Sequence, residues 1–156
     1  MLEIYTDGAS SPKKRFGGYG AVLVKDDGII KMLFGGTNNT TNNRMELMGP
    51  IEMLEALSKP LTLKLYTDSE YVKNGITEWI QKWKRNGWVS QKWNSQETTP
   101  VKNKDLWVRL DNLNQLHNIE WCWVKGHAGN KYNEIVDDLA VCGKEDAMKM
   151  WEKINA

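Results

Sequence analysis

Apolar positions along the chain follow two different periods, and these periods predict the secondary structure. Five stretches are rich in aliphatic, aromatic and β-branched residues and are bounded by turn residues, which is typical of strands. They cover residues 2–6, 17–25, 29–34, 61–67 and 119–124. Other stretches repeat apolar residues every three or four positions, as amphipathic helices do. These predicted helices cover residues 43–58, 69–75, 77–85, 103–116 and 131–142, followed by a helical tail at about 144–155.

The order of these elements predicts a mixed sheet. Residues 26–28 (Asp-Asp-Gly) are a strong hairpin signal, so the first three strands are expected to form an antiparallel meander. Helices separate the later strands, which are therefore expected to pair in parallel through right-handed crossovers. The sequence thus predicts an α/β fold with a five-stranded mixed sheet, three strands antiparallel and then two parallel, and helices on both faces. We expect a single domain over residues 1–156, with its core in residues 2–142.

Two segments are expected to be irregular. Residues 89–100 are polar and follow neither period, so they are predicted to form an exposed loop. Pro50 lies inside the first long helix and has no N–H to donate to the carbonyl of Glu46. This predicts a kink or a loosened turn at Glu46.

Composition narrows the class of protein. Of 156 residues, 40% are hydrophobic and 26% are charged, which indicates a folded chain rather than a disordered one. No apolar run reaches the roughly 18–20 residues of a membrane span, and the first residues lack the pattern of a secretion signal. A cytoplasmic protein without membrane association is therefore expected. Cys122 and Cys142 fit neither a metal-binding spacing nor a disulfide framework, and we interpret both as reduced core residues.

Basic and aromatic residues are concentrated in one part of the sequence. The chain as a whole has a net charge of +1, but residues 73–104 contain seven Lys or Arg against two Glu, a local charge of +5. Four of the eight tryptophans, at positions 79, 83, 88 and 93, lie in the same window. This mixture favours a surface for a phosphate backbone. The alternative is a solvated helix face whose tryptophans belong to the core.

Two predicted strands end in the same tripeptide, Tyr-Thr-Asp, which places Asp7 and Asp68 at equivalent positions. Equivalent ends of parallel strands lie at the same edge of a sheet, where ligand sites of α/β proteins tend to form. If the two strands are neighbours, the carboxylates lie a few ångströms apart, at a strand spacing of roughly 5 Å. Two carboxylates at this short distance repel each other unless they share a proton or a cation. The alternative is that each Asp only caps a turn.

Three further residues are candidates for the same chemistry. Glu46 lies near the N-terminus of a predicted helix, where an acidic side chain can also serve only the helix dipole. Asp137 and Asp138 lie inside a predicted helix, so one should face solvent while the other borders the core and needs a partner. His127 lies between glycines in a loop and can titrate near neutrality, although such a residue is more often simply exposed.

The ordered motifs of this chain resemble the type 1 ribonuclease H family, in its bacterial form. The matching segments are Tyr-Thr-Asp-Gly (5–8), Gly-Gly-Tyr-Gly-Ala (17–21), Thr-Thr-Asn-Asn-Arg-Met-Glu-Leu-Met (40–48), Thr-Asp-Ser-Glu-Tyr-Val (67–72), Gly-Ile-Thr-Glu-Trp-Ile (75–80), Trp-Lys-Arg-Asn-Gly-Trp (83–88), Pro-Val-Lys-Asn-Lys-Asp-Leu-Trp (100–107), Trp-Val-Lys-Gly-His-Ala-Gly (123–129) and Asp-Asp-Leu-Ala (137–140). The resemblance covers about residues 2–142 and implies a ribonuclease H-like fold.

The resemblance also implies an activity and the residues that carry it. The activity is endonucleolytic hydrolysis of the RNA strand of RNA–DNA hybrids, without sequence specificity, leaving 5′-phosphate and 3′-hydroxyl ends. Asp7, Glu46, Asp68 and Asp137 would form the catalytic metal-binding cluster, and His127 would assist proton transfer or product departure. The residues expected to contact nucleic acid are Thr41, Asn42, Asn43, Trp79, Trp83, Lys84, Arg85 and Trp88.

Elementary chemistry agrees with these implied roles. Phosphodiester hydrolysis by two divalent cations uses one to activate water and the other to stabilise the departing 3′ oxygen. Carboxylate oxygens select hard ions, so we expect two Mg²⁺ ions, for which Mn²⁺ can substitute. Two other classes remain as alternatives, a hybrid-binding module without activity and a related-fold nuclease acting on DNA. A monomer is expected, because the sequence shows neither a coiled-coil seam nor a large unpaired apolar surface.

Overall fold

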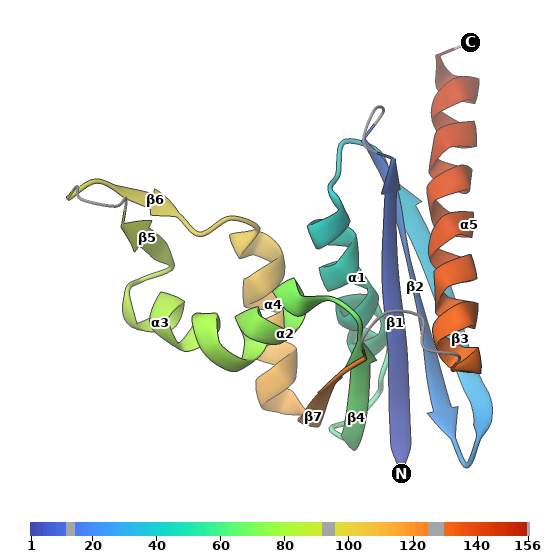
Figure 1. Ribbon diagram of the computed structural model, residues 1–156, viewed down its shortest axis with the longest axis horizontal. Coiled ribbons are helices and arrows are strands. Elements are labelled where there is room, and N and C mark those ends of the chain that lie inside the picture. The colour runs from blue at the N-terminus through green and yellow to red at the C-terminus, as the bar shows by residue number, and fades with distance from the viewer. Residues whose placement is uncertain (12–14, 92–95, 125–129, 156) are drawn as a thin grey trace.

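The fold is built on one mixed sheet. The computed structural model describes residues 1–11, 15–91, 96–124 and 130–155. Its five-stranded sheet has the order β3-β2-β1-β4-β7 (Figure 1). The strands are β1 (Leu2–Ser11), β2 (Phe16–Lys25), β3 (Gly28–Thr37), β4 (Thr62–Thr67) and β7 (Asn118–Trp123). The first three strands pair antiparallel, whereas β1, β4 and β7 pair in parallel, which confirms the predicted fold class.

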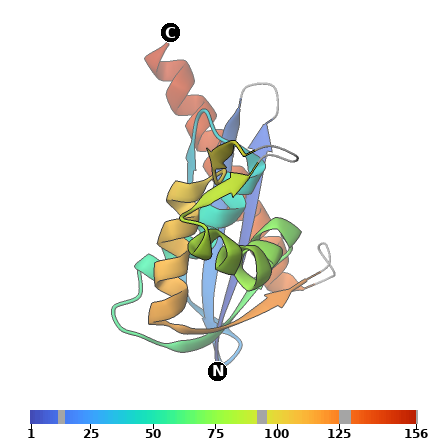
Figure 2. The same ribbon diagram turned by 90° about the vertical axis from the view of Figure 1, so that its left-hand side faces the viewer.

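Helices cover both faces of this sheet because side chains alternate along its strands. Ile4 of β1 belongs to a core shared with α1 (Asn42–Glu55) and α4 (Lys104–Leu116). Its neighbour Tyr5 points to the other face and packs with Tyr132 and Val136 of α5 (Lys131–Ile154). Figures 1 and 2 show α1 and α5 on opposite sides of the sheet. Among the described residues, no helix is both long enough and apolar enough to cross a membrane.

The strand β1 is longer than predicted, and this places Asp7 inside it. Its parallel pairing with β4 ends at Tyr5 and Tyr66, but its antiparallel pairing with β2 continues to Ser11. The polar residues after Asp7 therefore belong to a two-stranded extension, whereas the predicted strand covers only residues 2–6. The predicted end of β1 was wrong because the apolar pattern of the strand stops close to where its pairing with β4 stops. The backbone pairing with β2 continues to Ser11 without an apolar pattern.

Two predicted breaks in helices are absent. The segment from residue 70 to residue 85 is helical without a gap, as α2 (Glu70–Asn74), the π-helical turn η1 (Gly75–Trp79) and α3 (Ile80–Arg85). Val72, Ile76 and Ile80 are all buried, so one apolar stripe runs through the segment. The predicted tail likewise continues the preceding helix as a single α5. At Gly143 this helix faces the sheet instead of ending.

Two further local predictions differ from the structure, and a third is not tested by it. Residues 89–100 were predicted to form a loop, but β5 (Val89–Gln91) and β6 (Thr98–Pro100) pair antiparallel. This ribbon is too short and too polar to show a period. The helix α1 continues through Pro50 and ends at Glu55, so Pro50 does not end the helix, and the kink or loosened turn at Glu46 stays a prediction. Neither cysteine is a buried core residue, since Cys142 is exposed and Cys122 is half-buried, although both are free as expected.

Candidate active site

Three of the predicted acidic residues meet where β4 ends beside β1. Asp7 lies two residues beyond the last β1 residue paired with β4, and Asp68 directly follows β4. Glu46 reaches the same point from the N-terminal part of α1. One carboxylate oxygen from each of the three lies within 4.8 Å of the others. The cluster combines residues separated by about 20 to 60 positions in the sequence, so only the folded chain assembles it.

A backbone N–H ties two of these carboxylates together. The N–H of Gly8 donates to Oδ1 of Asp7 and to Oε1 of Glu46, each at 2.8 Å. This contact depends on the absence of a side chain at Gly8, because a Cβ there would lie 2.6 Å from the backbone nitrogen of Glu46. Glycine thus allows β1 to approach α1 closely enough for the two acidic side chains to meet.

The second oxygen of Glu46 finds no hydrogen-bond partner in the part of the chain that the structure describes. Glu46 is only 4% exposed, and its Oε2 is buried without a hydrogen bond among the described residues. A buried carboxylate oxygen that accepts nothing is costly unless a proton or a cation neutralises it. With Asp7 and Asp68 supplying further oxygens, this donor set fits a hard divalent cation.

Electrostatics points the same way. Burial is the main cause that raises the pKa of Asp7 to about 6. The nearby charges of Asp68 and Asp137 act in the same direction, and hydrogen bonds with Glu46 and Gly8 oppose the shift. Burial and the Asp7 charge together raise the pKa of Glu46 well above its ordinary value. In the absence of metal the pair therefore retains a proton near neutral pH. A bound cation would take over the neutralising role of that proton.

Asp137 approaches the cluster from the opposite face of the sheet. It is half-buried on α5 and lines an open cleft of about 530 Å³ together with the three clustered acids. Asp137 does not belong to the three-oxygen cluster itself, which groups only Asp7, Glu46 and Asp68. Its neighbour Asp138 is exposed. The remaining candidate, His127, lies outside the described residues.

Backbone contacts hold the walls of the cleft. The indole Nε1 of Trp123, at the end of β7, donates to the backbone carbonyl of Asp68 at 3.2 Å. Thr41 caps α1 by accepting from the N–H of Arg44 at 3.2 Å. The exposed side chains of Asn42 and Asn43 follow this cap and line the cleft beside Glu46. The cap thus fixes the position from which these amides face the acidic cluster.

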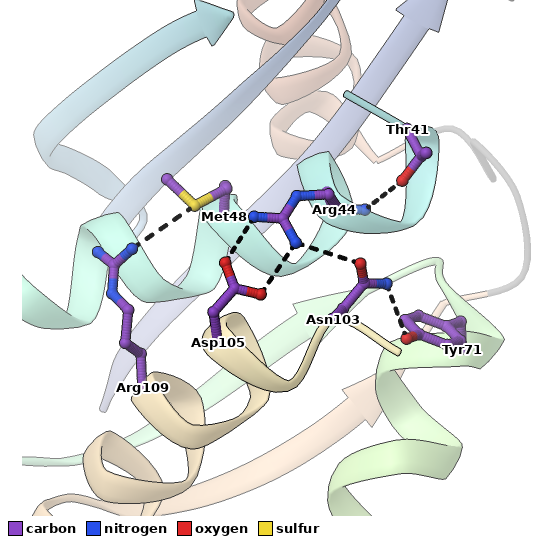
Figure 3. A network of polar contacts seen from close by, with 7 residues as sticks. All are labelled: Thr41, Arg44, Met48, Tyr71, Asn103, Asp105 and Arg109. Atoms are coloured by element: carbon purple, nitrogen blue, oxygen red, sulfur yellow. Dashed lines mark hydrogen bonds and ion pairs between the residues drawn. The ribbon is translucent and has the colours of Figure 1, made fainter. Parts of the chain in front are cut away.

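A polar network joins this turn to two other helices (Figure 3). The guanidinium of Arg44 donates to both oxygens of Asp105 at 3.0 and 2.7 Å and to Oδ1 of Asn103 at 3.2 Å. The hydroxyl of Tyr71, which lines the cleft, accepts from Asn103 Nδ2 and from Trp107 Nε1, both at 3.0 Å. Sequence reasoning did not select Arg44, Asn103 or Tyr71. They lie inside the quoted motifs, but nothing in the sequence pairs residues about 30 to 60 positions apart.

The basic, tryptophan-rich segment extends away from the sheet on α2, η1 and α3 (Figure 1). The rings of Trp79, Trp83 and Trp88 lie in contact, with centroids 6.0 and 6.2 Å apart. Trp83 and Trp88 are half-buried against the main core, whereas Trp79 is exposed. The segment therefore has features of both a core element and an exposed surface, because part of its aromatic surface packs internally and part faces solvent.

Its cations also differ from one another. Nζ of Lys84 lies 3.3 Å from Oδ2 of Asp111, a buried acid on α4 that also accepts from Gln115. Arg85 is exposed at the end of α3. The fold and these sites together define an α/β protein with an acidic metal-binding cleft flanked by a basic, aromatic projection.

Comparison with known proteins identifies the family. The RNase H family model matches residues 1–145. The ribonuclease H of Anaplasma marginale (strain St. Maries) is 56% identical over 139 residues, which cover 89% of this chain and 87% of that protein. The ribonuclease H of Legionella pneumophila (strain Corby) is 52% identical over 145 residues, covering 93% and 97%.

A solved structure agrees with these relatives. The crystal structure of LC9-RNase H1, a type 1 RNase H with the type 2 active-site motif, superposes with a TM-score of 0.75 at 27% identity. The match covers 94% of this chain and 72% of that one. The chain belongs to the ribonuclease H family. The predicted class of enzyme, a metal-dependent endoribonuclease, is confirmed with it.

Proposed function

We propose that this enzyme hydrolyses the RNA strand of RNA–DNA hybrids in the cleft above β1 and β4, leaving 5′-phosphate and 3′-hydroxyl ends. The observation that carries the proposal is the largely buried cluster of Asp7, Glu46 and Asp68, in which one oxygen of Glu46 has no hydrogen-bond partner among the described residues. The family relationship supplies the reaction class. We also propose that the protein works in the cytoplasm, where both types of nucleic acid are accessible in bacteria.

Asp7, Glu46, Asp68 and Asp137 would hold two Mg²⁺ ions, for which Mn²⁺ can substitute. When bound, such ions neutralise the phosphate, activate water and stabilise the leaving 3′ oxygen. The chain itself supplies a preorganised donor set, because Gly8 fixes one oxygen of Asp7 and one of Glu46 before the metal arrives. His127 would carry a proton to or from the reacting groups.

Recognition of the hybrid would rest on two surfaces. Thr41, Asn42 and Asn43 lie beside Glu46 and offer amide and hydroxyl groups to the ribose 2′-hydroxyls in the minor groove. The projection that carries Trp79, Trp83, Lys84, Arg85 and Trp88 would contact the backbone of the hybrid by charge and stacking. Such contacts carry little sequence information, so cleavage is expected to be non-specific.

Cleavage assays on three matched duplexes test this function. Wild-type enzyme with Mg²⁺ should cut the RNA–DNA hybrid and leave double-stranded DNA and double-stranded RNA intact. Asp7→Asn keeps the shape and the hydrogen bond from Gly8 but removes a charge, so it should lower kcat by at least about 1,000-fold while hybrid binding persists. Cleavage of the DNA duplex would support the DNA-nuclease alternative instead. Hybrid binding without cleavage would support the binding-module alternative.

Metal binding provides a second test, separate from turnover. Calorimetric titration of wild-type protein with Mn²⁺ should show binding that Asp7→Asn and Glu46→Gln weaken. Asp138→Asn is the matched control, because Asp138 is exposed beside Asp137 and lines no part of the cleft. Equal Mn²⁺ affinity in all four proteins would refute the assignment of the carboxylates as ligands.

A further inference from the structure

Asp68 is held differently from the other two acids of the cluster. The carboxylates of Asp7 and Glu46 share the N–H of Gly8, whereas no donor among the described residues reaches the carboxylate of Asp68. The Asp68 carboxylate nevertheless lies within 4.8 Å of an oxygen of each of the other two acids, where like charges repel one another. Its position therefore depends on how its own backbone is fixed.

The backbone of Asp68 lies between two elements and belongs to neither. β4 ends at Thr67, and α2 begins at Glu70. The peptide group that joins Asp68 to Ser69 is nevertheless fixed at both of its polar atoms. Its N–H donates to Oγ1 of the buried Thr67 at 3.1 Å, and its carbonyl accepts from Nε1 of Trp123 at 3.2 Å. Among the described residues, this indole is the one donor to the Asp68 carbonyl.

Trp123 itself is anchored in the sheet. It is the last residue of β7 and pairs with Thr67, and the N–H of Val124 donates to the carbonyl of Thr67 at 2.9 Å. Nζ of Lys73, from α2, lies 5.4 Å from the centroid of the Trp123 ring, a distance at which a cation attracts the face of an indole. One side chain of β7 thus contacts both ends of the segment from Asp68 to Lys73.

We propose that Trp123 is a positioning residue for the metal site. Its indole N–H fixes the Asp68 peptide and thereby keeps the Asp68 carboxylate close enough to Asp7 and Glu46 to share a cation with them. Trp123 lines the cleft but offers no ligand oxygen, so its effect on the metal passes through Asp68. Residues that orient metal ligands typically change metal affinity by roughly 10- to 100-fold when they are replaced. The inference rests on the proposed metal site.

Calorimetric titration with Mn²⁺ tests this role without turnover. Trp123→Phe removes the Nε1 donor but keeps an aromatic ring beneath Lys73, and it should weaken Mn²⁺ affinity about tenfold. Trp121→Phe is the matched control, because Trp121 lies on the same strand and its Nε1 donates to Oδ1 of Asn114 on α4, at 2.9 Å and outside the cleft. Unchanged affinity in Trp123→Phe, or an equal loss in both variants, overturns the proposal.

The Mg²⁺ dependence of cleavage separates positioning from contact with the substrate. Trp123→Phe should raise the Mg²⁺ concentration for half-maximal kcat about tenfold, while saturating Mg²⁺ should restore kcat and leave KM for the hybrid unchanged. A raised KM at saturating Mg²⁺, with the metal requirement of wild type, would instead show that the indole contacts the hybrid directly and would overturn the proposal.

A measurement on the wild-type protein does not depend on how the variants fold. In ¹⁵N–¹H NMR spectra recorded during titration with Mg²⁺, the indole cross-peak of Trp123 should move as the metal fixes Asp68, whereas that of Trp121 should stay in place. An unmoved Trp123 cross-peak in protein that calorimetry shows to bind the metal overturns the positioning role alone. Wild-type protein that binds neither Mn²⁺ nor Mg²⁺ overturns the proposed metal site together with it.

Discussion

Asp7 and Glu46 retain a proton at a pH where most carboxyl groups have lost theirs, because both are buried and the Asp7 charge further raises the pKa of Glu46. The ordinary pKa of Asp is 3.8, and here it rises to about 6. Between these values the folded protein holds a proton that the unfolded chain has released. The contribution of Asp7 to stability therefore falls as pH rises through this range, and its loss is complete above about pH 6. The arrangement favours metal binding at the expense of the metal-free fold.

Asp7→Asn should therefore stabilise the metal-free protein at pH 7. The gain is expected to be about 1–3 kcal/mol, since one pKa unit corresponds to about 1.4 kcal/mol. At pH 3 the gain should nearly vanish, because the wild-type carboxyl is then mostly protonated in both states. Urea unfolding in the presence of a chelator at the two pH values measures this. An equal gain at both would show that the substitution acts through packing and not through charge.

His117 contributes a pH dependence of the opposite sign. It is 5% exposed, and its Nδ1 accepts from the N–H of Leu61 at 3.0 Å, between α1 and β4. Burial lowers its pKa below 6.5. As pH falls below 6.5 the unfolded chain gains a proton that the folded ring resists, so stability is lost.

His117→Asn should remove this acid-dependent loss, at the expense of about 0.5–1.5 kcal/mol at pH 7 for the weakened hydrogen bond. The measurement is the difference in unfolding free energy between wild type and variant from pH 7.5 to 5, which cancels the shared contribution of the carboxyl cluster. The difference should shrink as pH falls. A constant difference over this range would rule out titration of His117 as the cause.

At the scale of elements, α5 depends on a backbone contact with the sheet. A Cβ on Gly143 would lie 2.1 Å from the carbonyl oxygen of Gly35, and a Cβ on Gly36 would lie 2.0 Å from the carbonyl oxygen of Gly143. Helix and strand thus touch through their main chains. This close packing also fixes the position of α5 along the sheet. It thereby positions Asp137, which lies nearly two turns earlier on α5 and lines the cleft.

Gly143→Ala should destabilise the protein by about 3 kcal/mol, because the new methyl group meets backbone atoms that cannot move aside cheaply. Gly28→Ala is the matched control, since the nearest atom to its Cβ is 3.6 Å away and the change should stay within about 0.5 kcal/mol. Thermal and urea unfolding of both variants measure the effect. Equal stability of the two would show that α5 shifts freely over the sheet.

The sequence predicted those elements whose own pattern carries them. The five strands, α1 and α4 were found from apolar period, and the matched Tyr-Thr-Asp ends located Asp7 and Asp68 correctly. The features that the apolar pattern did not predict depend on contacts between residues distant in sequence. The end of β1 is held by β2, and the network of Arg44 with Asp105 and Asn103 joins α1 to α4. The exposed edge of β3 was also invisible, because its alternating apolar residues look like those of a covered strand.

At the scale of the whole molecule, charge is divided between two regions. The net charge is +1, yet the cleft gathers Asp7, Glu46, Asp68 and Asp137 while residues 73–104 carry +5. In the proposed function, a hybrid bound by the projection would bring its phosphates to an acidic cleft that repels them until cations neutralise it. Binding and cleavage should thus respond differently to ions, with monovalent salt weakening the first and divalent cations enabling the second.

The salt dependence of hybrid binding should separate two neighbouring cations of the projection. Arg85 is exposed, so it can contact a phosphate of the hybrid and displace a counterion bound there. Arg85→Ala should therefore reduce the slope of log affinity against log salt by about 1. Lys84 is held by the buried Asp111, so Lys84→Ala should change the slope less but lower the melting temperature, since it leaves that acid without its cation. Titrations of a fluorescent hybrid in the presence of EDTA, from 50 to 300 mM KCl, measure both slopes while cleavage is blocked. If Lys84→Ala changes the slope as much as Arg85→Ala with no loss of melting temperature, Lys84 leaves Asp111 to bind phosphate, and the two side chains act as one patch.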